Sequence, residues 1–126
     1  MKTVGVIDYG LGNLTSVAGA IRKLGHEPLI SAASAVLAKT DCLILPGVGA
    51  FGDGMEHLRE RDLVGPLSKL VLDEGMPIFG ICLGSQLLGR ESEEFGRHEG
   101  LGWVDVTVHR LPATGASGEK IRVPHV

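Results

Sequence analysis

Short apolar runs alternate with segments of helical periodicity along much of the chain. Four of these runs are apolar or rich in β-branched residues, which predicts strands buried in a sheet. They cover residues 3–7, 27–30, 42–45 and 77–81. Residues 103–109 alternate well enough to predict a fifth strand, and another strand is expected to begin at Ile121, after a polar turn at residues 114–118.

The segments between these runs predict helices. Apolar residues recur at helical spacing over residues 14–24, where Asn13 is a suitable N-cap and Gly25 a suitable residue to end the helix. The other helices are expected over residues 32–39, 55–61, 63–74 and 85–94. Strands that alternate with helices predict an α/β fold with a mainly parallel sheet covered on both faces. Ligands of such sheets bind beyond the carboxyl ends of the strands.

The composition fits a globular domain with an excess of glycine. The chain has 126 residues, and its 19 glycines are roughly twice the average usage of about 7%. The glycines cluster after the first, third and fourth apolar runs, where a parallel sheet binds its ligand. The net charge of −3 argues against a nucleic-acid-binding surface.

Several other classes of protein fit the sequence poorly. The N-terminal apolar run ends at Asp8, which is too early for a signal peptide, and no stretch is long enough to span a bilayer. We therefore expect a cytoplasmic protein without membrane association. The two cysteines form no C-x-x-C pair and the histidines are scattered, so we expect neither a metal nor a cofactor.

The fourth run leads into Gly80-Ile81-Cys82-Leu83-Gly84, a G-x-C-x-G sequence between a strand and a helix. This is the form of the nucleophile elbow G-x-S-x-G, with cysteine in place of serine. The flanking glycines leave room for the neighbouring strand and helix, and the helix N-terminus would favour a Cys82 thiolate. The backbone N–H of Leu83 could then face a developing oxyanion. The alternative is a buried structural cysteine, the role we expect for Cys42.

The loop after the third run, Pro46-Gly47-Val48-Gly49, is a second candidate for the site. Its glycines let the backbone approach a ligand, so an amide at Val48 or Gly49 could be a second oxyanion donor. The alternative is an ordinary glycine-rich turn. A dinucleotide site is disfavoured, because Gly10-Leu11-Gly12-Asn13 lacks the third glycine of that fingerprint.

A thiol nucleophile needs a base, usually a histidine oriented by a carboxylate. None of the histidines stands in a motif that marks it as this base, and we expect each to be a surface residue. They follow a helix (His26), lie within a charged helix (His57), in a loop (His98) and at a strand end (His109), or come next to last in the chain (His125).

Four segments together resemble the class I (triad) glutamine amidotransferases. The nucleophile segment, residues 80–88, is similar to that of the whole family. Residues 7–14, 45–52 and 122–126 are similar to the HisH subunits of imidazole glycerol phosphate synthases. The resemblance implies a flavodoxin-like, three-layer α/β/α glutaminase that hydrolyses glutamine to glutamate and ammonia. It also implies a heterodimer with HisF, a (β/α)8-barrel cyclase that uses the ammonia to form imidazole glycerol phosphate in histidine biosynthesis.

The resemblance assigns roles to individual residues of this sequence. Cys82 would attack the glutamine side-chain amide and form a glutamyl thioester. The amides of Val48, Gly49 and Leu83 would form the oxyanion hole, after the Val48 peptide reorients. The remaining assignments are substrate binding (Gly47, Gly84, Gln86) and contact with the synthase partner (Gly10, Gly12, Asn13, Pro124, His125).

The sequence departs from the family pattern in three places. Ser85 stands where methionine is common, and Gly89-Arg90 replaces bulkier residues. The third departure bears on activity: the family's catalytic histidine and glutamate lie in a His-x-Glu segment, and none occurs in these 126 residues. We therefore expect residues 1–126 to be the N-terminal part of the amidotransferase domain, incomplete at its C-terminus and inactive or poorly active alone.

Other functions remain open at this stage. The chain could be a HisH-like amidotransferase subunit of another synthase, for instance in surface-sugar biosynthesis. It could also be a non-catalytic scaffold that kept the fold; the intact Cys82 elbow argues against this, and the missing base argues for it. A redox sensor fits poorly, because no resolving cysteine lies near Cys82 in the sequence.

Overall fold

A sheet of four parallel strands forms the centre of the molecule. The computed structural model describes residues 1–92 and 97–108. The strands β1 (Thr3–Ile7), β2 (Glu27–Ser31), β3 (Cys42–Leu45) and β4 (Ile78–Gly80) pair in the order β2-β1-β3-β4. The predicted α/β architecture with a parallel sheet is therefore confirmed. The predicted strands at residues 3–7, 27–30, 42–45 and 77–81 match it to within one residue at each end.

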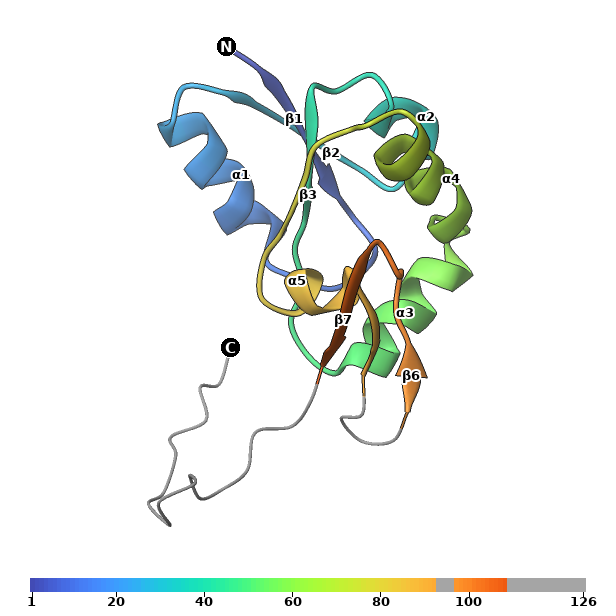
Figure 1. The fold of residues 1–126 in the computed structure, drawn as a ribbon. Helices are drawn as coiled ribbons and strands as arrows, with labels where there is room; N and C mark the ends of the chain where they lie inside the picture. The colour runs from blue at the N-terminus through green and yellow to red at the C-terminus, as the bar shows by residue number, and fades with distance from the viewer. Residues whose placement is uncertain (93–96, 109–126) are drawn as a thin grey trace, which may run out of the picture.

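The helices lie on both sides of this sheet but in unequal number (Figure 1). α1 (Leu14–Lys23) packs on one face, and α2 (Ser34–Leu37), α3 (Phe51–Glu60) and α4 (Val64–Ser68) lie on the other. A π-helical turn, η1 (Lys69–Asp73), continues α4, and α5 (Leu83–Leu87) follows β4. In the described residues, no helix combines the length and apolar character needed to cross a membrane.

The two ends of α1 show why it forms where the sequence predicts. The Asn13 side chain accepts a hydrogen bond from the Ser16 backbone N–H at 3.1 Å, which satisfies one of the free amides at the helix start. After the last turn, Gly25 adopts φ +86°, a left-handed conformation that glycine enters without steric cost. The predicted cap and the predicted stop are both present.

The apolar core is divided between the two faces of the sheet. The larger cluster lies on the face of α2, α3 and α4 and contains thirteen buried residues, including Ile7, Tyr9, Leu45, Phe51 and Leu83. The cluster beneath α1 is smaller and contains Val4, Val6 and Ile21 as buried members. Most of the stabilising burial of apolar surface is therefore on the α3 side.

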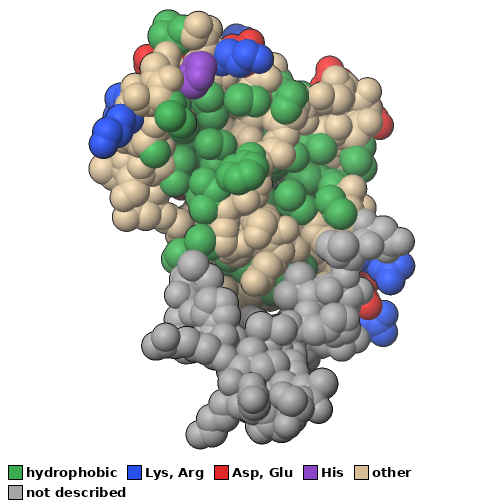
Figure 2. All heavy atoms as spheres, turned by 60° about the vertical axis from the view of Figure 1, so that its left-hand side comes forward, with side chains coloured by type: hydrophobic (Ala, Val, Ile, Leu, Met, Phe, Trp, Pro, Cys, Tyr) green, Lys and Arg blue, Asp and Glu red, His purple; other side chains and the backbone are tan. Residues whose placement is uncertain are grey.

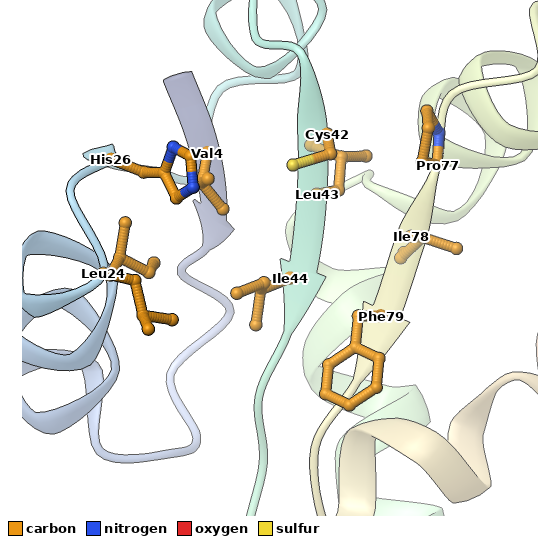
Figure 3. A pocket seen from close by; sticks show the side chains of 10 residues that line it. Val4, Leu24, His26, Cys42, Leu43, Ile44, Pro77, Ile78 and Phe79 are labelled. Atoms are coloured by element: carbon orange, nitrogen blue, oxygen red, sulfur yellow. The ribbon is translucent and has the colours of Figure 1, made fainter. Parts of the chain in front are cut away.

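Helices lie on both faces of the sheet, as expected, but among the described residues the cover over β3 and β4 on the α1 side is partial. On the α1 side an apolar pocket of about 290 Å³ opens between α1 and these two strands. Figure 2 shows hydrophobic side chains spread over this side of the molecule, and Figure 3 shows Leu24 and His26 facing Cys42, Ile44 and Phe79 across the pocket. The physical reason is that α1 alone packs on this face among the described residues, and most of its contacts with the sheet are with β1 and β2.

Exposure of individual side chains agrees with this open face. Phe79 is 67% exposed, and Cys42, expected in the core, is only partly buried at the pocket wall. Figure 3 shows the Cys42 sulfur pointing toward the α1 side. Cys42 therefore borders the small cluster under α1 instead of lying inside a closed core.

The predicted helix over residues 85–94 is wrong at residues 89–92, and residues 93 and 94 lie outside the described residues. α5 ends at Leu87, and the chain then forms β5 (Gly89–Ser92), which pairs with β6 (His98–Glu99) and β7 (Val104–Val108) in a second sheet of order β6-β5-β7. β6 is antiparallel to β5, whereas β7 is parallel to it. Residues 89–92 form a strand because they pair with strands farther along the chain. Helical periodicity in the sequence does not reveal such pairing.

Smaller differences concern element boundaries. α3 begins at Phe51, four residues before the helix predicted over residues 55–61. The helix predicted over residues 63–74 is divided into α4 and η1. The strand predicted at residues 103–109 is present as β7, and the turn at residues 114–118 and the strand from Ile121 lie outside the described residues.

Candidate active site

Cys82 occupies a sharp turn between β4 and α5, at the carboxyl end of the sheet. Its backbone has φ +54° and ψ −121°, a region that residues with a side chain rarely adopt. Three hydrogen bonds close the turn: the Gly84 N–H donates to the Ile81 carbonyl, and the N–H and hydroxyl of Ser85 donate to the Cys82 carbonyl at 3.0 and 2.7 Å. The thiol is thus held in a fixed and strained position, and its side chain is partly exposed.

The two flanking glycines are required by close approach of the backbone. A Cβ atom on Gly80 would lie 2.5 Å from the Ser85 Cα, closer than real Cβ contacts occur. A Cβ atom on Gly84 would overlap the carbonyl oxygen of Leu45 at the end of β3. The G-x-C-x-G spacing therefore permits the start of α5 to rest directly on the sheet, which is the geometry of a nucleophile elbow.

The loop of residues 46–49, which we call the oxyanion loop, lies against this elbow. The Leu83 backbone N–H donates a hydrogen bond of 3.2 Å to the Gly47 carbonyl. A Cβ atom on Gly47 would lie 3.2 Å from the Gly84 nitrogen and from the Leu83 Cβ. The structure thus brings together Gly47, Leu83 and Gly84, as the sequence predicts for one site.

The Gly47–Val48 peptide has a definite orientation. Its carbonyl faces Leu83, and because a trans peptide is planar its N–H points the opposite way. Val48 is 48% exposed, and Gly49 has φ +107°, which only glycine adopts readily. In this arrangement the Val48 amide faces away from the elbow, and the Leu83 amide already has an acceptor.

The Gly10–Asn13 loop packs beside the oxyanion loop. A Cβ atom on Gly12 would lie 3.1 Å from the Pro46 Cβ and 3.2 Å from the Gly47 nitrogen. Gly10 lies next to His57 and Arg61 of the α3 region, and Asn13 caps α1. Gln86 is partly buried in α5, one turn after Cys82. The other two residues expected at the partner interface, Pro124 and His125, lie outside the described residues.

The described histidines each make specific contacts within the fold. The expectation that each is a simple surface residue is therefore wrong for them. His26 is partly buried at the apolar pocket, and its Nδ1 accepts a hydrogen bond from the Lys2 N–H at 3.1 Å. His57 Nδ1 lies 3.0 Å from the Tyr9 carbonyl oxygen and 3.4 Å from the Arg61 guanidinium. His98 belongs to β6 instead of a loop, and its ring packs against Gly52. His109 and His125 lie outside the described residues.

Tyr9 is a residue of this site that the sequence reasoning missed. Its side chain is fully buried, and its hydroxyl donates a hydrogen bond of 2.5 Å to the Pro46 carbonyl at the start of the oxyanion loop. Burial raises the pKa of the Tyr9 hydroxyl above its ordinary value, so the group remains a proton donor. The sequence feature that could have identified Tyr9 is its position just after the first strand, at the carboxyl edge where a parallel sheet binds its ligand.

A parallel α/β sheet with a strained cysteine in a nucleophile elbow after one of its strands, here β4, is typical of α/β enzymes that use a thiol nucleophile. The chain belongs to the family described as "Glutamine amidotransferase class-I", whose model matches residues 5–126. A crystal structure titled as that of a glutamine amidotransferase has the same fold, with a TM-score of 0.73 at 25% sequence identity. That similarity covers 85% of this chain and 56% of the solved one.

Among curated proteins, the chain is similar to several named "Imidazole glycerol phosphate synthase subunit HisH". It is 48% identical to that of Geobacillus thermodenitrificans over its whole length and 46% identical to that of Sulfurimonas denitrificans over 98% of its length. These alignments cover 59% and 58% of the two relatives. The chain therefore spans less than two thirds of the length of the curated relatives that it matches.

Proposed function

We propose that this chain is the nucleophile-bearing part of the glutaminase subunit of an imidazole glycerol phosphate synthase. The observation that carries the proposal is the backbone of Cys82, held at φ +54° between two glycines that the local packing requires. The family match and the HisH relatives support glutamine as the substrate. In this proposal Cys82 is the nucleophile, the role that the sequence predicts.

The proposed reaction proceeds through a thioester. The Cys82 sulfur attacks the side-chain carboxamide carbon of glutamine, and the carbonyl oxygen becomes an oxyanion. Collapse of this intermediate breaks the C–N bond, and the leaving nitrogen takes up the proton lost by the thiol and departs as ammonia. Water then hydrolyses the γ-glutamyl thioester, which releases glutamate and restores the thiol. Gly47, Gly84 and Gln86 border the elbow and the oxyanion loop, where the substrate binds in this proposal.

The oxyanion hole needs one local rearrangement. If the Gly47–Val48 peptide turns over, its carbonyl leaves the Leu83 N–H and the Val48 N–H comes to face the elbow. A single rotation thereby supplies two donors, with the Gly49 amide as a further donor beside them. The absence of a side chain at Gly47 and the positive φ of Gly49 make such a rotation sterically accessible.

Partner binding is the second part of the proposal. In HisH-type enzymes the ammonia passes to the cyclase barrel HisF, and the Gly10–Asn13 loop and the Pro124-His125 segment would face that barrel. The Gly10–Asn13 loop touches Pro46 and Gly47, so a partner that presses on it acts next to the peptide that must turn. The proposed partner thus contacts this chain beside its oxyanion loop.

Glutamine hydrolysis tests the proposal. We expect the 126-residue chain alone to be a poor or inactive glutaminase, because its sequence contains no His-x-Glu segment. Ammonia release is measured with and without a HisF-type cyclase subunit, and the Cys82→Ala variant is the matched control. Robust turnover by the isolated chain would refute the expected lack of a base, and turnover that survives Cys82→Ala would refute the role of the thiol.

A further inference from the structure

Three successive carbonyl groups at the end of β3 each accept a hydrogen bond from a different donor. The Leu45 carbonyl accepts from the Ile81 N–H at 2.9 Å, and the Gly47 carbonyl accepts from the Leu83 N–H at 3.2 Å. The Pro46 carbonyl between them accepts from the Tyr9 hydroxyl at 2.5 Å. Two of the donors therefore come from the elbow, and the middle one comes from the segment after β1.

The middle hydrogen bond is the one next to the peptide that must turn. Pro46 has no backbone N–H, so its carbonyl is the only backbone group through which this residue can be tethered. Rotation of the Gly47–Val48 peptide breaks the bond from Leu83 to Gly47 but leaves the Pro46–Gly47 peptide in place. The hydrogen bond from Tyr9 is compatible with both orientations, and it holds the fixed end of the rotating segment.

Tyr9 also contacts the far side of the same loop. Its backbone carbonyl oxygen lies 3.0 Å from His57 Nδ1, within hydrogen-bond distance, and His57 lies in α3, the helix that follows the oxyanion loop. The Tyr9 hydroxyl lies so close to Gly47 that a Cβ atom there would collide with it. One buried residue thus contacts the start of the oxyanion loop, its first glycine and the helix after it.

From these contacts we propose that Tyr9 is a positioning residue whose hydroxyl fixes the pivot of the oxyanion loop. The proposal rests on the proposed function for its catalytic meaning, but the structural step can be measured without activity. Tyr9→Phe removes the hydroxyl alone. The loop then loses its tether at Pro46, and the hydrogen bond from Leu83 to Gly47 opens more often.

Amide hydrogen exchange measures this opening directly. In Tyr9→Phe, exchange at the Leu83 amide should rise about tenfold, the expected effect of losing one supporting hydrogen bond. Exchange at the Ile81 amide, which donates to Leu45, should change by less than about twofold, whereas general destabilisation would raise both equally. Thr40→Val is the matched control, because it removes a buried hydroxyl that donates to the Leu37 carbonyl, away from the loop. This control should leave the ratio of the two exchange rates unchanged.

A chemical measurement adds the catalytic readout. Acylation of Cys82 by γ-glutamyl p-nitroanilide develops an oxyanion, whereas alkylation by iodoacetamide does not. Tyr9→Phe should lower the acylation rate about tenfold and leave alkylation unchanged, since misplaced donors affect the oxyanion alone. If the unsubstituted chain is not acylated, which its lack of a His-x-Glu segment permits, the exchange measurement alone decides the role of Tyr9. Equal exchange ratios in the parent chain and Tyr9→Phe, or equal acylation rates in a reactive chain, would overturn the positioning role.

Discussion

The backbone N–H of Leu83 donates a hydrogen bond of 3.2 Å to the carbonyl of Gly47, and this contact joins the elbow to the oxyanion loop. The same amide is the oxyanion donor that follows the nucleophile in the proposed reaction. In the proposed reaction the described structure would therefore be a resting arrangement, because the Leu83 amide is engaged and the Val48 amide faces away. Activation in this account consists of turning one peptide.

The close packing of Gly84 on β3 predicts a severe effect of adding one methyl group. Gly84→Ala places a Cβ atom where the Leu45 carbonyl oxygen lies, so α5 must move away from the sheet. We expect a loss of at least about 3 kcal/mol in the free energy of unfolding, measured by urea denaturation.

Gly19→Ala is the matched control for this substitution. Gly19 lies in α1, is exposed, and has open space where its Cβ would be. Alanine there should stabilise the chain by about 0.5–1 kcal/mol, because it lowers the entropy cost of forming the helix. Effects of the same sign and size at the two positions would contradict the packing argument.

The strained backbone of Cys82 predicts that glycine is better tolerated there than alanine. Cys82→Gly relieves the cost of φ +54°, whereas Cys82→Ala retains it, and both remove the thiol. We expect Cys82→Gly to be more stable than Cys82→Ala by about 1 kcal/mol, although glycine also raises the entropy of the unfolded chain. Thermal or urea unfolding of the two variants measures this difference in stability. A more stable alanine variant would show that the turn is unstrained.

The first part of the sheet could be predicted because its signals are local. The strand over residues 42–45 is continuously apolar, and Asn13 and Gly25 mark the two ends of a helix whose apolar stripe has the right period. The second sheet could not be predicted in the same way, since Gly89–Ser92 becomes a strand only through pairing with β6 and β7. The open pocket beside Phe79 also depends on which helices are present, which periodicity does not report.

The candidate site also contains residues that local sequence predicts and a residue that it does not. The G-x-C-x-G spacing identifies the elbow because steric crowding permits only glycine at residues 80 and 84, and this is visible in sequence. Tyr9 was missed because its role depends on one side-chain hydrogen bond to a residue 37 positions away. No local pattern encodes a contact of that kind.

The raised pKa of Tyr9 predicts a pH dependence of stability. In the unfolded chain the hydroxyl loses its proton near pH 10, whereas in the folded chain burial keeps it protonated to a higher pH. The stabilising contribution of Tyr9 is therefore fully present below pH 10 and decreases as the pH rises above that value. The stability difference between the parent chain and Tyr9→Phe, from urea unfolding at several pH values from 8 to 11, should become smaller. A constant or growing difference would contradict the buried, protonated hydroxyl.

The open face of the sheet predicts that two phenylalanines differ strongly in their contribution to stability. Phe79 is 67% exposed and Phe51 is 1% exposed. Phe79→Ala should cost about 1 kcal/mol or less, whereas Phe51→Ala should cost about 3–5 kcal/mol. Urea unfolding of the two variants measures this contrast, and similar losses at both positions would mean that Phe79 is covered in solution.

The nucleophilic role of Cys82 is the central claim, and selective labelling tests it most directly. The chain has two cysteines, both partly buried, so Cys42 serves as an internal control in one experiment. The chain is treated with the glutamine analogue 6-diazo-5-oxo-L-norleucine, and mass spectrometry follows each cysteine and free cysteine in parallel. We expect Cys82 to be modified at least about tenfold faster than Cys42 and faster than free cysteine, because the elbow holds the thiol where the analogue binds. Modification of Cys82 no faster than that of free cysteine would contradict the account and favour a scaffold that kept only the fold.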